Sequence, residues 1–112
     1  MQTIADFCVV PMGVTASVSQ YVAECQRVLE RSGLSYSMHA YGTNVEGEWD
    51  DVCRVMKECH EAVHAMGCPR VSTSVRIGTR TDKVGQTMQD KVKVVEEILA
   101  KDAGVVNTAY AR

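Results

Sequence analysis

Two amphipathic helical segments alternate with short strand-like segments along the first eighty residues. Apolar side chains recur every three or four positions in residues 17–32 and about 50–66, the spacing of one helical face. The strand-like segments, rich in β-forming residues, are 4–10, 35–42, 44–49 and 70–77. The order strand, helix, strand, strand, helix, strand is the ferredoxin-like βαββαβ pattern. The sequence therefore predicts an α+β fold.

This pattern predicts a four-stranded antiparallel sheet with both helices on one face and the other face open. The 112 residues suffice for one domain, which we expect to span 1–102, with a C-terminal tail at 103–112. An extra helix is expected at about 87–101. Its apolar residues are expected to face inward: Met88, Val92, Val95, Ile98 and Leu99.

Local signals mark the ends of these elements. Ser17, followed three residues later by Gln20, is typical of a capping box at the start of the first helix. Gly33 is placed to end that helix in a left-handed conformation. Gly42 and Thr43 form a turn candidate between the second and third strands.

Positive charge is concentrated at the end of the fourth strand, in Arg76, Arg80 and Lys83. We expect the second and fourth strands to be parallel, which would bring the Gly-Thr pairs at 42–43 and 78–79 to one rim of the sheet beside these cations. The basic segment has three open interpretations: exposed loop charge, a contact with a neighbouring subunit, or a phosphate site.

Alternation along the strands predicts which side chains line the open face. The outward set is Asp6, Cys8, Val10, Ser37, His39, Tyr41, Asn44, Glu46, Ser72, Ser74 and Arg76. The set that faces the helices is Phe7, Val9, Met38, Ala40, Val45, Val71, Thr73, Val75 and Ile77. We expect Arg76 to pair with Glu46 or Asp6. Such a face is a binding floor, a solvated surface or a wet subunit interface.

A zinc-protease signature, HEAVH, occurs at residues 60–64. Helical geometry places His60 at the boundary of the apolar stripe and His64 on the surface, and His39 is expected on the far side of the sheet. We therefore expect no metal there. A nucleophilic pair of Cys8 and His39 lacks a third orienting group.

Composition excludes several classes of protein. A net charge of −2 argues against general nucleic-acid binding. No apolar run approaches the length of a membrane span, and no secretory signal is visible, so a cytoplasmic protein is expected. The five cysteines show no CxxC spacing and are expected to be free thiols. No cofactor is predicted.

Four stretches together resemble a known family. They are VVPMGV with SVSQYV (9–22), YGTNVEGEWDDV (41–52), KECHEAVHAMG (57–67) and RVSTSVRIGTRTDK (70–83). The chain resembles the thiamine-binding proteins of the YkoF-like superfamily. Its EGEWDDV and GTRTDK motifs are most similar to those of fungal members. The resemblance implies a ferredoxin-like domain that assembles through its sheets into dimers or tetramers. It also implies that thiamine or its hydroxymethylpyrimidine half is bound without catalysis.

The chemistry of thiamine suggests roles for the open-face residues. Asp6 and Glu46 can offset the thiazolium charge, and Arg80 and Lys83 suit a phosphorylated form or a neighbouring subunit. The donors and acceptors on the pyrimidine edge can form hydrogen bonds with Thr43, Asn44, Ser72 and Ser74. Arg76 is expected close to these residues and is included in the predicted ligand-binding set. Tyr41 or Trp49 can stack on a ring. Two alternatives remain: a protein whose open face serves only self-assembly, and a small enzyme that uses Cys8, His39 or Glu46.

Overall fold

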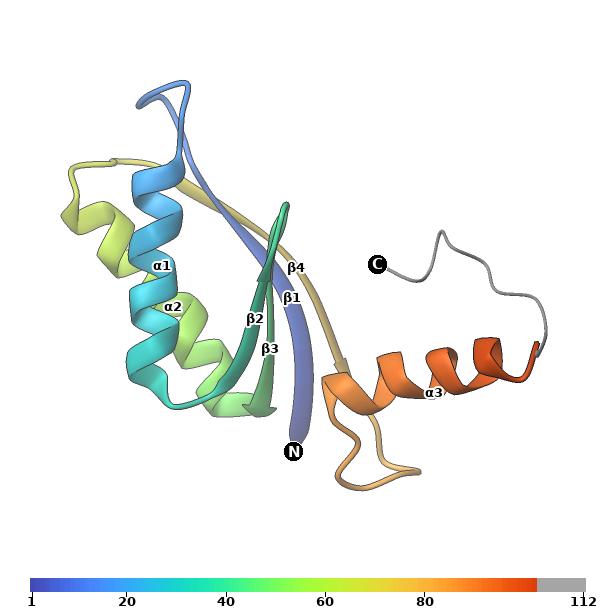
Figure 1. Cartoon of the computed structure of the whole chain (residues 1–112). Helices are drawn as coiled ribbons and strands as arrows, with labels where there is room; N and C mark the ends of the chain where they lie inside the picture. Colours follow the sequence, from blue (N-terminus) through green and yellow to red (C-terminus); the bar gives the residue numbers. More distant parts are fainter. Residues whose placement is uncertain (103–112) are drawn as a thin grey trace.

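The computed structural model describes residues 1–102, so the predicted tail at 103–112 lies outside the described residues. Its elements are β1 (Gln2–Pro11), α1 (Ser19–Ser32), β2 (Ser35–His39), β3 (Gly42–Glu48), α2 (Trp49–Ala65), β4 (Val71–Thr79) and α3 (Met88–Ala100) (Figure 1). The strands form one antiparallel sheet in the order β2-β3-β1-β4. The predicted α+β, ferredoxin-like fold is confirmed.

The core lies between the sheet and α1 and α2, which cover the same face (Figure 1). It contains few aromatic side chains and is filled by small and branched apolar groups. Its buried members are Ala5, Phe7, Cys25, Val28, Leu29, Val45, Val52, Val55, Cys59, Val63 and Cys68. Phe7 is the one aromatic residue among them, so most of the packing comes from aliphatic chains and thiols.

The ends of α1 agree only partly with the sequence signals. Gly33 adopts φ 74° and ends the helix in the left-handed region, as predicted. The predicted capping box is wrong, because the helix begins after Val18 without a side-chain cap. The Ser17 hydroxyl instead lies 3.2 Å from the Ser19 hydroxyl.

The relative direction of the strands corrects another prediction. β2 pairs antiparallel with β3, β3 with β1, and β1 with β4. Three successive reversals make β2 and β4 antiparallel to each other, whereas β3 and β4 run the same way. The pairs at 42–43 and 78–79 therefore do not share one rim: Thr43 neighbours Phe7 in the middle of β1, whereas Gly78 neighbours Ile4 near its start.

The turn between β2 and β3 lies at residues 40–41, two positions before the predicted turn. Gly42 already belongs to β3, and its role is one of close packing. A Cβ atom at Gly42 would lie 2.5 Å from the backbone oxygen of Phe7, so only glycine allows β1 and β3 to approach this closely. With β3 starting here, Thr43 shares a face with Val45 and points toward the helices.

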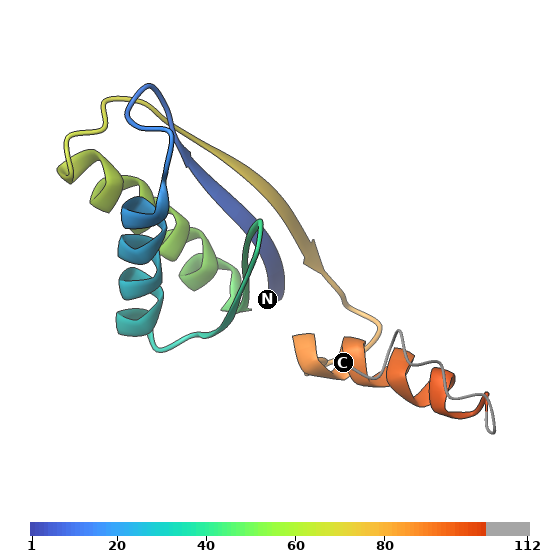
Figure 2. The same cartoon turned by 45° about the horizontal axis from the view of Figure 1, so that its top comes forward.

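The inward orientation predicted for α3 is wrong for the isolated chain. The helix begins beside the open face of the sheet and then projects away from it, on the side opposite α1 and α2 (Figures 1 and 2). Val92 and Ile98 are 60% and 58% exposed, and α3 has no buried residue. Thr87 and Asp90 cap its first turn with a reciprocal capping box. None of the helices within residues 1–102 has the length and hydropathy needed to cross a membrane.

Candidate functional site

A hydrogen-bonded network of three charged or titratable side chains crosses the open face. Asp6 accepts a hydrogen bond from Arg76 Nε at 3.0 Å, and His39 Nε2 lies 2.7 Å from Asp6 Oδ1. The hydrogen bond from Arg76, followed by the one from His39, holds the pKa of Asp6 below its usual value. The predicted ion pair of Arg76 is confirmed, and its partner is Asp6.

Strand register explains the network. Asp6 and Arg76 are directly opposed on β1 and β4 and point to the same face. His39 must reach over β3 to meet Asp6, and it does so at Gly42. The His39 ring carbon Cε1 would lie only 3.4 Å from a Cβ atom at Gly42. The missing side chain thus leaves room for the imidazole, which within the described residues pairs with Asp6 and not with Cys8.

A groove of about 770 Å³ lies between the open face and the segment that leads into α3. Its floor is formed by residues of β1, β3 and β4, including Ile4, Asp6, Asn44 and Arg76. Its rim comes from the loop after β4 and the first turn of α3. Five of the ten side chains predicted from the sequence line this groove: Asp6, Asn44, Arg76, Arg80 and Lys83.

The basic residues of the rim differ in how they are engaged. Arg80 binds both carboxylate oxygens of Asp82, at 2.7 and 2.9 Å, and its Nη1 donates to Gln86 at 2.9 Å. The hydrogen bond with Asp82 raises the pKa of Arg80 and lowers that of Asp82. Lys83 and Lys91 also line the groove and form no ion pair within residues 1–102.

Glu46 lies on the predicted face and contacts the start of α3. Its Oε2 accepts a hydrogen bond from the backbone N–H of Met88 at 2.8 Å, at the N-terminus of α3. A carboxylate there satisfies an otherwise unpaired donor and complements the helix dipole. The side chain is half-buried and does not line the groove. Its position therefore favours anchoring of α3 over contact with a thiazolium.

Four other predicted residues lie outside the groove. Thr43, predicted to lie in a turn at the rim, is only 4% exposed and accepts a hydrogen bond from Gln26 Nε2 at 2.9 Å, because β3 begins earlier than the sequence suggested. Tyr41 is 86% exposed at the turn between β2 and β3. Ser72 and Ser74 lie on the open face of β4, opposite Val10 and Cys8, beyond the groove.

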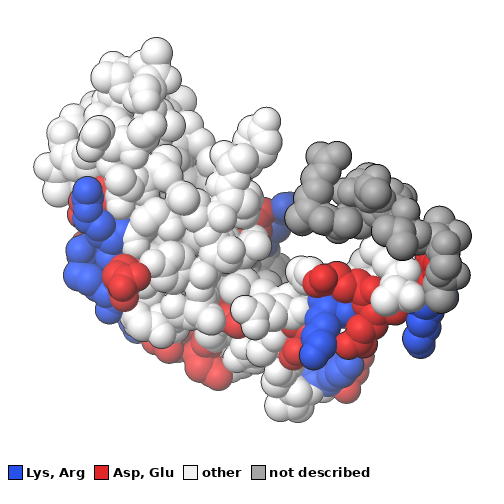
Figure 3. All heavy atoms as spheres, viewed as in Figure 1, with Lys and Arg blue, Asp and Glu red and all other residues white. Residues whose placement is uncertain are grey.

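A second cavity, of about 200 Å³, lies between α1 and the β2–β3 turn. Its lining is mostly apolar, including Val18 and Val22, and its polar members are Gln26, His39 and the two predicted site residues Tyr41 and Thr43. Sequence reasoning did not select Gln26, although its place on the flank of the first helix was visible. Lys, Arg, Asp and Glu are absent from the upper end of the molecule in Figure 3, around residues 11–18, whereas they gather along α3.

The HEAVH histidines hold the fold together locally. His60 Nε2 lies 2.6 Å from the Thr73 hydroxyl of β4, and His64 Nδ1 lies 2.8 Å from the backbone oxygen of Cys68. His60 is half-buried and His64 is exposed, as predicted. No group of three potential metal ligands occurs in the part of the chain that the structure describes.

The five cysteines are free thiols, as predicted. Three of them, Cys25, Cys59 and Cys68, are buried in the core. A hydrogen bond with Cys25, together with burial, raises the pKa of Cys59, so this thiol is held neutral. Packing accounts for the buried cysteines without a role as nucleophiles.

Comparison with known proteins identifies the family. The profile described as "Thiamine-binding protein" matches residues 5–96, which include all four strands from Ala5 onward and most of α3. The chain belongs to the thiamine-binding protein family.

Relatives within this family carry a name that assigns no function. UPF0045 protein sll0230 of Synechocystis is 62% identical over 86% of this chain and 78% of its own length. The fungal UPF0045 protein ECM15 of Eremothecium gossypii is 45% identical over 89% of this chain and 95% of its own length. The chain is thus similar to a fungal protein, and its sequence identity to the cyanobacterial relative is higher.

Solved structures show the same fold. The hypothetical protein MJ1052 of Methanocaldococcus superposes with a TM-score of 0.78 at 33% identity, over 86% of this chain and 97% of that one. A Thermotoga maritima protein, named for a suggested role in thiamine biosynthesis or salvage, superposes with a TM-score of 0.72 at 19% identity. It covers 85% of this chain and 99% of its own. At that identity the likeness supports the fold alone.

Proposed function

We propose that this member of the thiamine-binding protein family binds thiamine or a related hydroxymethylpyrimidine, without catalysis, in the groove on the open face. The observation that carries the proposal is the convergence of Asp6, Asn44, Arg76, Arg80 and Lys83 around one cavity of about 770 Å³. This volume lies within the range of roughly 300–1,000 Å³ that is typical of small-molecule sites.

The groove offers the groups that an aminopyrimidine needs. The Asn44 amide carries both a donor and an acceptor, and it lies opposite Asp6 on the floor. Ile4 and Val84 provide apolar surface on either side. The cavity between α1 and the β2–β3 turn, at about 200 Å³, falls below the usual volume for a whole ligand. It is therefore the second choice of location.

We also propose that the protein acts as a homo-oligomer in the cytoplasm. The apolar stripe of α3 is exposed, and β4 is an edge strand whose outer backbone groups face no neighbouring strand within residues 1–102. Both features favour pairing with another copy. They equally support the second candidate function, a protein whose open face serves only self-assembly. Free thiols favour a reducing compartment.

Titration calorimetry with thiamine and with hydroxymethylpyrimidine tests the proposal. We expect saturable binding of at least one of them, and a loss of about tenfold in affinity for Asn44→Ala, because a hydrogen bond in a buried site contributes about 1 kcal/mol or more. Val22→Phe, which fills the smaller cavity, serves as the matched control for location. Binding lost in Val22→Phe and kept in Asn44→Ala would move the site to the smaller cavity. Absence of any binding leaves the self-assembly function.

A further inference from the structure

The groove carries a strong excess of positive charge for a site that would hold a cation. We infer that it takes the phosphate group of a phosphorylated ligand, so that its preferred molecule is a phosphate ester of thiamine or of the hydroxymethylpyrimidine alcohol. The inference rests on the proposed function and names the form of the ligand.

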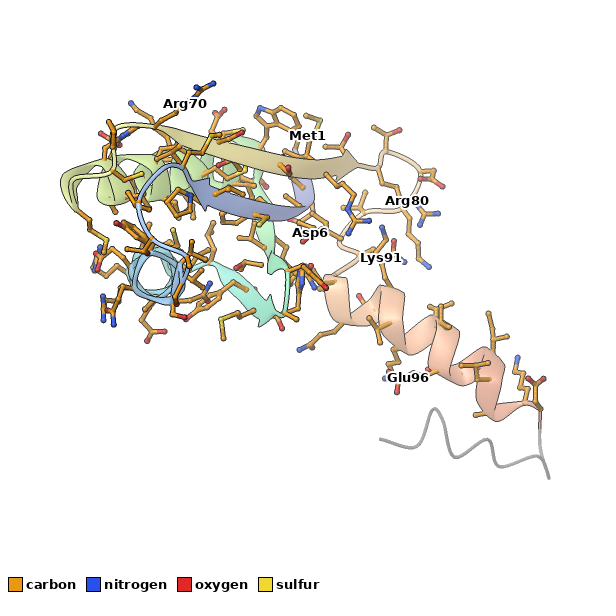
Figure 4. All side chains as sticks on the ribbon, turned by 90° about the horizontal axis from the view of Figure 1, so that it is seen from above. Met1, Asp6, Arg70, Arg80, Lys91 and Glu96 are labelled. Carbon is orange, nitrogen blue, oxygen red and sulfur yellow. The ribbon has the colours of Figure 1, made fainter. Side chains whose placement is uncertain are left out.

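Four basic side chains and one carboxylate line the groove. Arg76 belongs to β4, Arg80 and Lys83 to the loop that follows, and Lys91 to the first turns of α3, while Asp6 is the single acid. Figure 4 shows Asp6, Arg80 and Lys91 on the same side of the sheet, facing the space between the sheet and α3. Cations from three consecutive segments thus converge on one volume.

The carboxylates that might attract a thiazolium are already engaged. Asp6 is hydrogen-bonded by Arg76 and His39, and Glu46 accepts from the Met88 N–H. A bare thiazolium in the groove would therefore meet Lys83 and Lys91 without an uncommitted carboxylate to offset its charge. A phosphate monoester carries about −1.5 to −2 at neutral pH, which is opposite in sign to the excess charge of the groove and can balance it.

Arg76 is positioned to bind such a group. Both of its recorded hydrogen bonds go to one oxygen of Asp6, from Nε and Nη2. Its Nη1 makes no hydrogen bond within the described residues, and the side chain is 86% exposed. Guanidinium groups favour phosphate oxygens because they offer several donors in one plane. Asp6 thus holds the guanidinium in place while leaving donors for the ligand.

Two further acids near the rim do not occupy the groove. Asp82 is turned to Arg80, and Asp90 caps α3 through the backbone N–H of Thr87. Neither lines the cavity. Arg80 is paired with Asp82 and Arg76 with Asp6, so the net positive charge of the groove comes from Lys83 and Lys91, while Arg76 adds unused guanidinium donors.

Calorimetric titration of the full chain with thiamine and with thiamine monophosphate tests the inference. We expect the monophosphate to bind at least tenfold more tightly, and added salt to reduce that advantage, because the attraction is electrostatic. In Lys83→Gln combined with Lys91→Gln, the ratio of the two affinities should fall close to one. Lys93→Gln is the matched control, since it removes a cation of the same helix that does not line the groove, and it should keep the ratio.

The outcomes separate this inference from the proposed function. Equal affinity for thiamine and its monophosphate in the unmodified protein, or a ratio unchanged in the double variant, overturns the phosphate inference and leaves the proposed function standing. If thiamine, thiamine monophosphate and hydroxymethylpyrimidine all fail to bind, both are overturned. Circular dichroism of the double variant checks that α3 and the sheet are intact. A fall in the ratio of the two affinities can then be attributed to the removed charges and not to misfolding.

Discussion

The His39 imidazole on β2 lies 2.7 Å from Asp6 on β1, although β3 separates the two strands in the sheet. Arg76 on β4 binds the same carboxylate from the other side. One carboxylate therefore connects the two edge strands through its side-chain contacts. This arrangement fixes the middle of the open face independently of any ligand.

Replacement of Asp6 by Asn should lower the free energy of unfolding by about 1 kcal/mol, the range of partly exposed ion pairs. Because the folded pKa of Asp6 lies below its usual 3.8, its contribution is complete above that value and is lost as the pH falls through the folded pKa. Urea unfolding of both proteins at several pH values measures this. The difference should be greatest near neutral pH and should vanish in acid.

Glu61→Gln is the control for that experiment. Glu61 is exposed on α2 and forms no ion pair within residues 1–102, so its replacement should change stability little at any pH. A difference between wild type and Asp6→Asn that does not shrink in acid would mean that the network adds no stability through the Asp6 charge.

Gly42→Ala should destabilise the fold by about 2–3 kcal/mol, the usual cost of overpacking a filled region. The added methyl group would lie 2.5 Å from the Phe7 backbone oxygen, which cannot move without bending β1. Gly78→Ala is the matched control, because a Cβ atom there has no neighbour within 4 Å. Chemical unfolding compares the two. Equal stabilities would show that β1 and β3 can separate at little cost.

The α3 stripe should mediate self-association. We expect the protein to sediment at micromolar concentration as a dimer or larger, and Ile98→Glu, which places a charge on a residue that is 58% exposed, to shift it toward monomer. Gln89→Glu adds the same charge to the same helix away from the stripe and should leave the assembly unchanged. A monomeric wild type, or an assembly unaffected by Ile98→Glu, would count against this interface.

Glu46→Ala should loosen α3 without unfolding the sheet. Its carboxylate bonds the Met88 N–H at 2.8 Å, and loss of such a contact costs about 1 kcal/mol, which corresponds to roughly fivefold faster hydrogen exchange in the first turns of α3. Mass-spectrometric exchange over residues 88–95, compared with the strands, measures this. Thr87→Ala removes the helix cap and should act in the same direction. Uniform loss of protection throughout the chain would instead make Glu46 a global stability residue.

Sequence periodicity was sufficient to predict the fold because both helices bury clear apolar stripes and the strands alternate. It also placed Phe7 inward and Asp6 and Arg76 outward, as found. It failed where a two-residue shift mattered: the turn at 40–41 rather than 42–43 moved Thr43 to the buried face. A Gly-Thr pair looks the same in a turn as in a strand that needs close packing.

The orientation of α3 was unpredictable for a different reason. An apolar stripe indicates that a helix needs a partner surface, but it does not say whether that surface belongs to the same chain. The contact of Glu46 with the Met88 N–H was hidden for the same reason, since it depends on where α3 begins. The groove itself arises from the path of residues 80–87, and local spacing carries no information about that path.

The residues that line the groove come from two kinds of segment, a contiguous basic stretch and the strands of the sheet. The cationic rim comes from one contiguous stretch, residues 76–91, whereas Asn44 and Ile4 on the floor come from strands whose other faces pack the core. Substitutions in that stretch can alter the charge that the site accepts while the strands beneath remain unchanged. For the proposed ligand, the contacts to the phosphate and the contacts to the ring would therefore come from separate parts of the chain, and each set could be changed by mutation without the other.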